Sequence, residues 1–241
     1  MLRVNNARLQ AQRPHGERPV SMELYLDTAD ARVVAELSQV LTVAGATTNP
    51  TIITRSGKTP EQVAAEMAEV LSPDQKLFMQ VIAEDAEGML AEARRICSLR
   101  EKNMCVKIPV TVEGMKAIKA AKADGLCVLA TAIYSADQAF LAAMNGADYL
   151  APYVNRMENL GDGVGQVLDL LQMLAGSGLD AKVIAASFKN VYQVHQLIAA
   201  GIQAVTLPPD IAWAMVKHPS TQIAVGEFND AWEAAFGRRS F

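Results

Sequence analysis

The sequence lacks a long apolar segment and an excess of basic residues. No stretch approaches the roughly 20 uninterrupted apolar residues that a membrane-spanning helix requires, and the N-terminus has no apolar block like that of a secretory signal. A formal net charge of −4 provides no basic surface for the backbone of a nucleic acid. We therefore expect a cytoplasmic protein that has neither a membrane nor a nucleic acid as its partner.

Cysteine is also scarce. The chain has three cysteines, Cys97, Cys105 and Cys127, and their spacing matches neither a disulfide framework nor a metal site. Two of them lie inside apolar runs, so we interpret all three as reduced packing residues.

The 241 residues are 51% hydrophobic and 20% charged, which is sufficient for one large domain with a single core. Residues 1–21 differ from the rest, because they carry four arginines against one acid and show no sustained apolar period. We expect residues 1–21 to be a flexible arm or an artefact of the assigned start, and residues 22–241 to form a single domain.

From Met22 onward, short runs rich in Val, Ile and Leu alternate with segments of helical period, as is typical of parallel βα units. Eight such units in this length favour a closed α/β fold, the (β/α)8 TIM barrel, over an open doubly wound sheet. The expected strands occupy residues 22–27, 41–49, 76–82, 104–110, 126–133, 148–154, 182–188 and 204–209.

Two further helices are expected after the eighth strand, separated near Pro219. The last one carries Phe228, Trp232 and Phe236, which is more apolar surface than a terminal helix needs. We expect this extra C-terminal helix to pack against a neighbouring subunit.

A lysine inside the run MCVKIPV is the least expected residue, because a buried charge is costly unless it is paired or neutralised. Lys107 could instead extend its amine to the surface, or form a buried ion pair with an acid such as Asp27. Burial in an apolar barrel would lower its pKa and leave part of the population neutral at pH 7. A neutral amine attacks carbonyl groups, as Schiff-base chemistry requires.

Polar residues also stand near the ends of most other predicted strands, where the active sites of such barrels gather. Each one alone has a structural explanation, such as a helix cap or a bonded interior hydroxyl. Together around one lysine they predict a pocket, which a purely structural barrel has no reason to build. These residues are Asp27, Thr48, Asn49, Gln80, Thr131, Tyr153 and Ser187.

A phosphate site is predicted from two further positions. Arg156 is expected in the loop after the sixth strand, although a solvated loop charge is an alternative explanation. Ser187 and the amides after it are expected to open the helix after the seventh strand. A guanidinium group and a helix N-terminus both attract anions, so the two positions together favour a phosphate.

Several motifs stand in a fixed order along the chain: LDTAD, AGATTNPTII, LFMQV, VKIPVT, VEGMKAIK, ATAIYS, APYVNR and AASFK. On these motifs the sequence resembles the transaldolase family, and more closely its fructose-6-phosphate aldolase branch, over most of its length. That family uses a Schiff-base lysine on strand four of a barrel, and Lys107 in VKIPVT matches this position.

The resemblance also implies roles for the other residues of the pocket. Asp27 and Asn49 would orient substrate hydroxyls and the lysine. Gln80 and Thr131 would hold a catalytic water, and Arg156 with Ser187 would bind the substrate phosphate.

Two positions distinguish the transaldolases from the aldolases in the family that the sequence resembles. Transaldolases of this family carry a glutamate on strand three and typically a phenylalanine on strand six, where this chain has Gln80 and Tyr153. This pair favours an aldolase that cleaves or forms fructose 6-phosphate from dihydroxyacetone and glyceraldehyde 3-phosphate, with Tyr153 as acid/base. No metal or organic cofactor is implied, because the iminium ion is itself the electron sink.

Two alternatives stay open at this point. The chain could be a transaldolase that moves a dihydroxyacetone unit to another sugar phosphate, or a sugar-phosphate-binding barrel without catalysis. The resemblance further implies a homo-oligomer, a decamer or a pentamer, with exchanged C-terminal helices. The chain differs in length from other members of the family by a few residues near 54–58 and 99–103. Both places fall in expected loops or helix ends.

Overall fold

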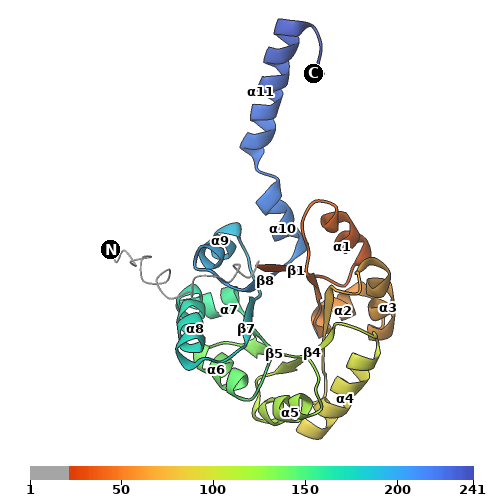
Figure 1. The fold of residues 1–241 in the computed structure, drawn as a ribbon, viewed down its shortest axis with the longest axis vertical. Coiled ribbons are helices and arrows are strands. Elements are labelled where there is room, and N and C mark those ends of the chain that lie inside the picture. The colour runs from red at the N-terminus through yellow and green to blue at the C-terminus, as the bar shows by residue number, and fades with distance from the viewer. Residues whose placement is uncertain (1–21) are drawn as a thin grey trace.

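The computed structural model describes residues 22–241, so the arm predicted for residues 1–21 lies outside the described part of the chain. Eight parallel strands form a closed barrel in which β8 pairs with β1. Helices surround the barrel, and one more helix follows at the C-terminus, which confirms the predicted fold (Figure 1). The strands are β1 (Glu23–Asp27), β2 (Gly45–Thr47), β3 (Lys76–Gln80), β4 (Met104–Pro109), β5 (Val128–Ile133), β6 (Tyr149–Pro152), β7 (Lys182–Ala185) and β8 (Ala204–Leu207).

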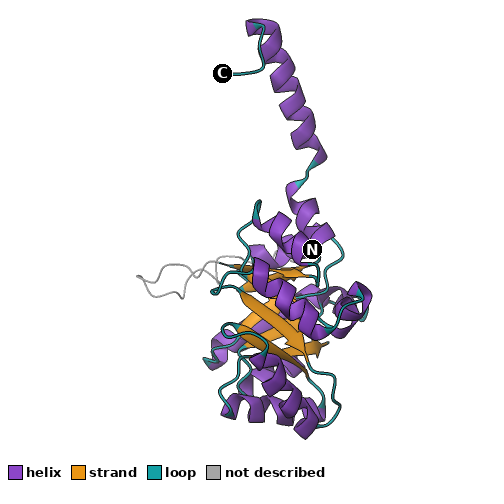
Figure 2. Ribbon diagram, turned by 90° about the vertical axis from the view of Figure 1, so that its right-hand side faces the viewer, coloured by secondary structure: helices purple, strands orange, loops and turns teal. Residues whose placement is uncertain are grey.

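The helices form a layer around the strands, which Figure 2 shows in orange within the purple helices. Two short helices, α2 and α7, follow β2 and β6 directly at places where the sequence did not predict a helix. The helices are α1 (Ala31–Ser38), α2 (Pro50–Ser56), α3 (Pro60–Val70), α4 (Ala86–Ser98), α5 (Val112–Ala123), α6 (Ala136–Met144), α7 (Val154–Glu158), α8 (Gly163–Ser177), α9 (Val191–Ala199), α10 (Pro209–Val216) and α11 (Pro219–Phe236).

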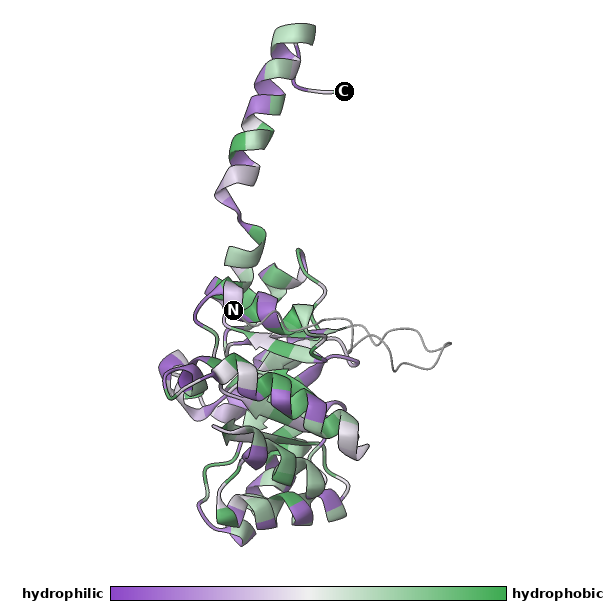
Figure 3. Ribbon diagram, turned by 90° about the vertical axis from the view of Figure 1, so that its left-hand side faces the viewer, coloured by the Kyte–Doolittle hydropathy of each residue, from purple (hydrophilic) through white to green (hydrophobic). Residues whose placement is uncertain are grey.

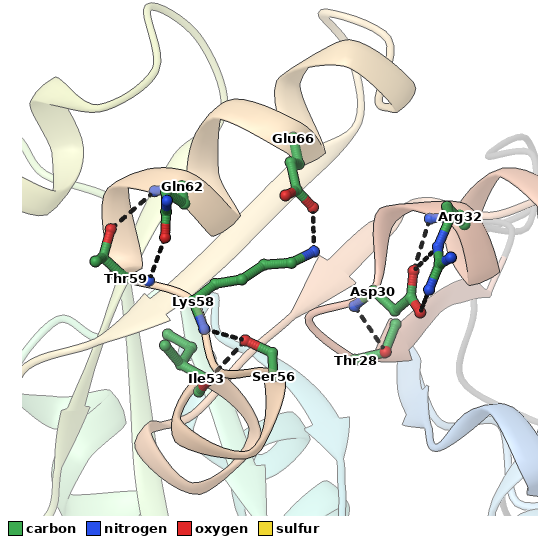
Figure 4. A network of polar contacts seen from close by, with 9 residues as sticks. All are labelled: Thr28, Asp30, Arg32, Ile53, Ser56, Lys58, Thr59, Gln62 and Glu66. Atoms are coloured by element: carbon green, nitrogen blue, oxygen red, sulfur yellow. Dashed lines mark hydrogen bonds and ion pairs between the residues drawn. The ribbon is translucent and has the colours of Figure 1, made fainter.

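Local hydrogen bonds fix where the first helices begin (Figure 4). The Asp30 side chain caps α1 by accepting from the amide two residues later. Thr59 and Gln62 form a reciprocal capping box at the start of α3. An ion pair between Lys58 and Glu66 joins the preceding loop to that helix. These contacts hold the first βα connections in place beside the C-terminal ends of β1 and β2.

Alternate residues of each strand face the barrel interior. On β4, Cys105 belongs to the interior cluster, whereas Val106 and Ile108 pack in the cluster between strands and helices. Period-two alternation therefore also places Lys107 on the interior side. The buried residues of the interior cluster are Tyr25, Phe78, Cys105, Leu129, Tyr149, Ala151, Ile184, Ala186 and Ala204.

Aromatic rings and one ion pair fill the half of the barrel interior at the N-terminal ends of the strands. The ring of Phe78 meets those of Tyr25 and Tyr149 edge to face, with centroids 5.3 Å apart in both pairs. At the N-terminal ends of the strands, Lys182 forms an ion pair with Glu23 at 2.6 Å. A ligand is therefore expected at the opposite, C-terminal end of the strands.

The three cysteines are free thiols, as the sequence predicted. Cys105 and Cys127 border the barrel interior, and Cys97 lies on α4. Burial raises the pKa of the Cys97 thiol to about 11, and the neighbouring thiol of Cys127 together with burial raises that of Cys105. Protonated, packed thiols of this kind have little nucleophilic reactivity.

The C-terminal helix α11 extends away from the barrel (Figures 1 and 3). It is joined to α10 through Lys217 and His218, and none of its residues is buried. Apolar and polar residues alternate along its length, as the green and purple bands in Figure 3 show. None of the helices in residues 22–241 combines the length and the apolar character needed to cross a bilayer.

Candidate active site at the C-terminal end of the barrel

Lys107 lies on β4 inside the barrel, and only 5% of its surface is exposed. The extension to the surface that was considered from the sequence is therefore wrong. Its Nζ donates to the backbone oxygen of Thr48 at 2.7 Å, and no ion pair joins it to a carboxylate among the described residues. Burial lowers the pKa of Lys107 below its usual 10.5, and the charge of Asp27 opposes this shift.

Asp27 stands at the end of β1 in a chain of buried hydroxyl groups. Thr47 Oγ1 donates to Asp27 Oδ1 at 2.8 Å and lies 2.6 Å from Thr206 Oγ1. Because Thr47 has one hydroxyl hydrogen, Thr206 is the donor of the second bond. Burial raises the pKa of Asp27, while Lys107 and Thr47 lower it. The sequence did not single out Thr47 or Thr206, although both lie at interior positions of their strands.

Thr48 and Asn49 contact the site in another way than expected. The Thr48 hydroxyl is fully buried and donates to the Phe78 carbonyl at 3.0 Å, so only its backbone oxygen reaches Lys107. Asn49 Oδ1 accepts from the amide of Ile52 and caps α2. The expected strand at 41–49 is shortened to β2 because these two residues already turn into that helix.

Gln80 is the neighbour of Lys107 on the adjacent strand β3. Its Oε1 is buried and has no hydrogen-bond partner among the described residues. Gln80 also borders two cavities. One of about 370 Å³ lies between β3 and the helices α2, α3 and α4, and one of about 580 Å³ lies beside the ends of β3 and β4. An unpartnered buried acceptor is costly, so this oxygen is available to a water molecule or a ligand donor.

Thr131 and Tyr153 come together across β5 and β6. Thr131 Oγ1 and the Tyr153 hydroxyl are 3.1 Å apart, and either can donate. The register of β5 against β6 shifts between Ala130 and Ile133, and Ala132 adopts a positive φ of 55°. An irregularity of this kind bends a strand and redirects its side chains. Here it occurs next to Thr131.

Arg156 lies in the short helix α7, which corrects the expectation of a loop. Its guanidinium carbon stands 4.7 Å from the centre of the Tyr153 ring, and its Nη1 donates to the Tyr134 hydroxyl at 3.0 Å. The rings of Tyr134 and Tyr153 meet edge to face with centroids 5.8 Å apart. Tyr134 follows β5 and was not among the residues predicted from the sequence.

Ser187 does not open the helix after β7, contrary to the sequence interpretation, because α9 begins at Val191 with Asn190 as its cap. Ser187 instead has a positive φ of 63°, and its carbonyl accepts from the amide of Asn155. That bond places Ser187 beside the first residues of α7, the helix that carries Arg156. A non-glycine residue in this conformation is strained, and such strain is concentrated at functional sites.

The described residues contain no group of three or more His, Cys, Asp or Glu side chains that could hold a metal ion. The polar groups brought together at this end are one amine, one carboxylate, hydroxyls, an amide and one guanidinium. Such a set can form an imine, transfer protons and bind an anion.

A family model described as Transaldolase/Fructose-6-phosphate aldolase matches residues 24–239. Among solved structures, a mandelate oxidase variant with an FMN adduct is 15% identical, with a TM-score of 0.55. A mutant flavocytochrome b2 with bound pyruvate is 12% identical, with a TM-score of 0.58. Both alignments cover 80% of this chain, and they span 66% and 58% of those chains. At these identities the likeness shows a common barrel fold alone.

We expect Asp27→Asn to lower the pKa of Lys107 further, because the Asp27 charge is what raises it against burial. The measurement is the pH dependence of labelling of Lys107 by an amine-selective reagent, read by peptide mass spectrometry. In the unmodified chain the midpoint should lie below 10.5, and in Asp27→Asn it should move to lower pH. The exposed Lys189 is the internal reference, and the extent of its labelling should be the same in both proteins. A midpoint that stays or rises would contradict the assigned coupling.

Proposed function

The chain belongs to the transaldolase/fructose-6-phosphate aldolase family, and we propose that it is an aldolase that cleaves or forms fructose 6-phosphate through a Schiff base on Lys107. The observation that supports this most directly is the buried amine inside the barrel, whose pKa is lowered by burial. A neutral amine at the C-terminal end of a closed barrel has the protonation state and the location that imine formation needs.

In the proposed reaction, the amine of Lys107 attacks the C2 carbonyl of open-chain fructose 6-phosphate, and loss of water gives an iminium ion. Removal of the proton from the C4 hydroxyl breaks the C3–C4 bond and releases glyceraldehyde 3-phosphate. The bonding electrons pass to the iminium and leave an enamine on the lysine. Protonation at C3 and addition of water then release dihydroxyacetone and restore the amine.

The proton carriers are assigned from their contacts. The Tyr153 hydroxyl, which is hydrogen-bonded to Thr131, is the acid/base that exchanges a proton with the C4 hydroxyl. The unpartnered Oε1 of Gln80 and the Thr131 hydroxyl hold the water that protonates and hydrolyses the intermediate. Asp27 keeps the amine oriented and stabilises the iminium charge. The Oδ1 of Asn49 caps α2, so its side-chain NH2 group remains available to a substrate hydroxyl.

Arg156 and Ser187 are proposed to hold the phosphate. Arg156 forms no ion pair with an acid of the described chain, so its charge is available to an anion. After β8 the chain continues with Pro208 and Pro209, which have no backbone N–H groups to offer a phosphate. This leaves the segment after β7, with the turn at Ser187, as the source of backbone donors.

Lys107→Met should abolish turnover, because methionine has a similar length and no nucleophile. Reduction with borohydride in the presence of dihydroxyacetone should add the mass of one reduced adduct to the peptide that contains Lys107. Lys182→Met, which changes a lysine at the opposite end of the barrel, is the control and should still be trapped. If no mass is added to the Lys107 peptide, the covalent mechanism is wrong.

The aldolase and the transaldolase differ in whether an acceptor aldose is required. We expect steady release of glyceraldehyde 3-phosphate from fructose 6-phosphate alone in a coupled assay, because Gln80 and Tyr153 replace the residues typical of transaldolases. Turnover that appears only after erythrose 4-phosphate is added would identify a transferase. A trapped adduct without turnover in either assay would favour a binding protein.

We further propose that the protein is a homo-oligomer, a decamer or a pentamer, assembled through α11. Val225, Phe228, Trp232 and Phe236 recur every three or four residues and therefore share one face of the helix. Phe228 is 69% exposed and Phe236 is 60% exposed in the single chain. A lone helix gains little stability from its own hydrogen bonds, so this face needs a covering partner.

Light scattering after size-exclusion chromatography should give a mass about five or ten times the 25.9 kDa of the single chain. Phe228→Asp places a charge on the apolar face of α11 and should shift the protein towards smaller species. Leu160→Asp, a matched change at a residue 77% exposed on the barrel body, should leave the mass unchanged. A wild-type mass of 25.9 kDa would contradict assembly altogether.

A further inference from the structure

Tyr134 lies within the motif ATAIYS, but neither the site residues predicted from the sequence nor the proposed mechanism includes it. It follows β5 at the rim of the barrel and is 36% exposed. Its hydroxyl accepts from Arg156 Nη1, and its ring lies edge-on against Tyr153. Arg156, in turn, lies over the Tyr153 ring. The three side chains thus form one contact cluster.

The hydrogen-bond capacity of this cluster is only partly used. A tyrosine hydroxyl has one hydrogen to donate, and within residues 22–241 that of Tyr134 has no acceptor. Arg156 donates to this hydroxyl and is paired with no carboxylate in the same part of the chain. Two donors, one of them cationic, therefore stand side by side at the rim with free hydrogens. A phosphate group accepts from donors arranged in this way.

We propose that the Tyr134 hydroxyl is a direct ligand of the substrate phosphate and a determinant of the preference for phosphorylated substrates. It holds Arg156 in place by accepting one hydrogen bond and donates its own hydrogen to a phosphate oxygen. This inference rests on the proposed function, because it concerns the substrate of the same site.

The arrangement also explains why a neutral hydroxyl serves better than an acid beside Arg156. A carboxylate at this position would neutralise the guanidinium and repel a phosphate. Tyr134 orients the guanidinium without removing its charge, and an oriented side chain loses less rotational freedom when it binds. Contact between Arg156 and Tyr153 places the anion site directly next to the proposed acid/base.

The direct test uses glycerol 3-phosphate, an unreactive phosphorylated probe, with titration calorimetry on the full chain. Tyr134→Phe removes only the hydroxyl, and we expect the Kd for this probe to rise about tenfold, as for loss of one hydrogen bond to a charged group. Tyr192→Phe, at an exposed tyrosine on α9, is the matched control and should leave the Kd unchanged. An unchanged Kd in Tyr134→Phe, or no binding to the wild-type chain, would overturn the proposal.

Two further readouts separate a phosphate ligand from a merely structural residue. In aldol addition, Tyr134→Phe should raise KM for glyceraldehyde 3-phosphate about tenfold and leave kinetics with unphosphorylated glyceraldehyde within about twofold. In an Arg156→Gln background the same change should have a smaller effect on probe binding, because the two donors act together. Equal losses with both aldehydes would refute a role in specificity.

The outcomes for this proposal and for the proposed function are distinguishable. If probe binding depends on Tyr134 but borohydride traps no adduct on Lys107, the phosphate site stands and the aldolase mechanism falls. If the adduct forms and probe binding ignores Tyr134, the mechanism stands and this assignment falls.

Discussion

The amine of Lys107 is kept out of water by the barrel wall, and the rest of the site is arranged around this constraint. Alternation along β4 directs the side chain inward, and the aromatic rings around Phe78 pack the barrel interior on its N-terminal side. An ammonium ion in this place would need compensation for lost hydration. The site supplies a single carbonyl bond from Thr48 and the charge of Asp27. Compensation is partial, so the pKa of the amine falls.

Asp27 is subject to the opposite constraint, because its own burial favours the neutral acid. The donor order Thr206 to Thr47 to Asp27 counters this tendency. If Asp27 carried a proton towards Thr47, both hydroxyl hydrogens would have to turn, and that of Thr206 would lose its acceptor. The two buried threonines therefore favour the carboxylate form. Burial thus lowers the pKa of Lys107 and raises that of Asp27, while the neighbours of each group oppose the shift. Opposed influences of this kind are typical of groups that accept and stabilise charge during a reaction.

The sequence predicted the barrel because hydrophobic periodicity reports which faces of each element are covered. The burial of Lys107 was also predicted, since a charge within an apolar run is conspicuous. The predictions from the sequence were wrong where the backbone conformation determines which group of a residue faces the site. Thr48 was expected among the polar residues of the pocket, but the turn into α2 directs its hydroxyl to the Phe78 carbonyl and its own carbonyl to Lys107. Ser187 was expected at a helix start, but its left-handed conformation lies ahead of the Asn190 cap.

The sequence also did not predict residues whose hydrogen-bond partners lie far away along the chain. Thr206 lies 159 residues from Thr47, and only closure of the barrel between β8 and β1 brings their hydroxyls together. In the sequence, Tyr134 is an ordinary aromatic residue at the end of a predicted strand. Its hydrogen-bond partner Arg156 lies 22 residues away. Single-residue patterns carry no information on such pairs, because each partner alone has an ordinary surface or core explanation.

The amide at Gln80 connects the electrostatics of the lysine to the choice between the two activities. Gln80 is the cross-strand neighbour of Lys107, and the site already contains the carboxylate of Asp27. A glutamate at this position would add a second negative charge near the amine and favour the ammonium form. A neutral amide leaves the amine more readily deprotonated, and its unpartnered oxygen remains free to hold water. In the proposed mechanism, water beside the enamine would favour its protonation and release over its retention for a second sugar. In the proposed mechanism, the absence of a carboxylate at position 80 would thus favour both a deprotonated amine and a free aldolase.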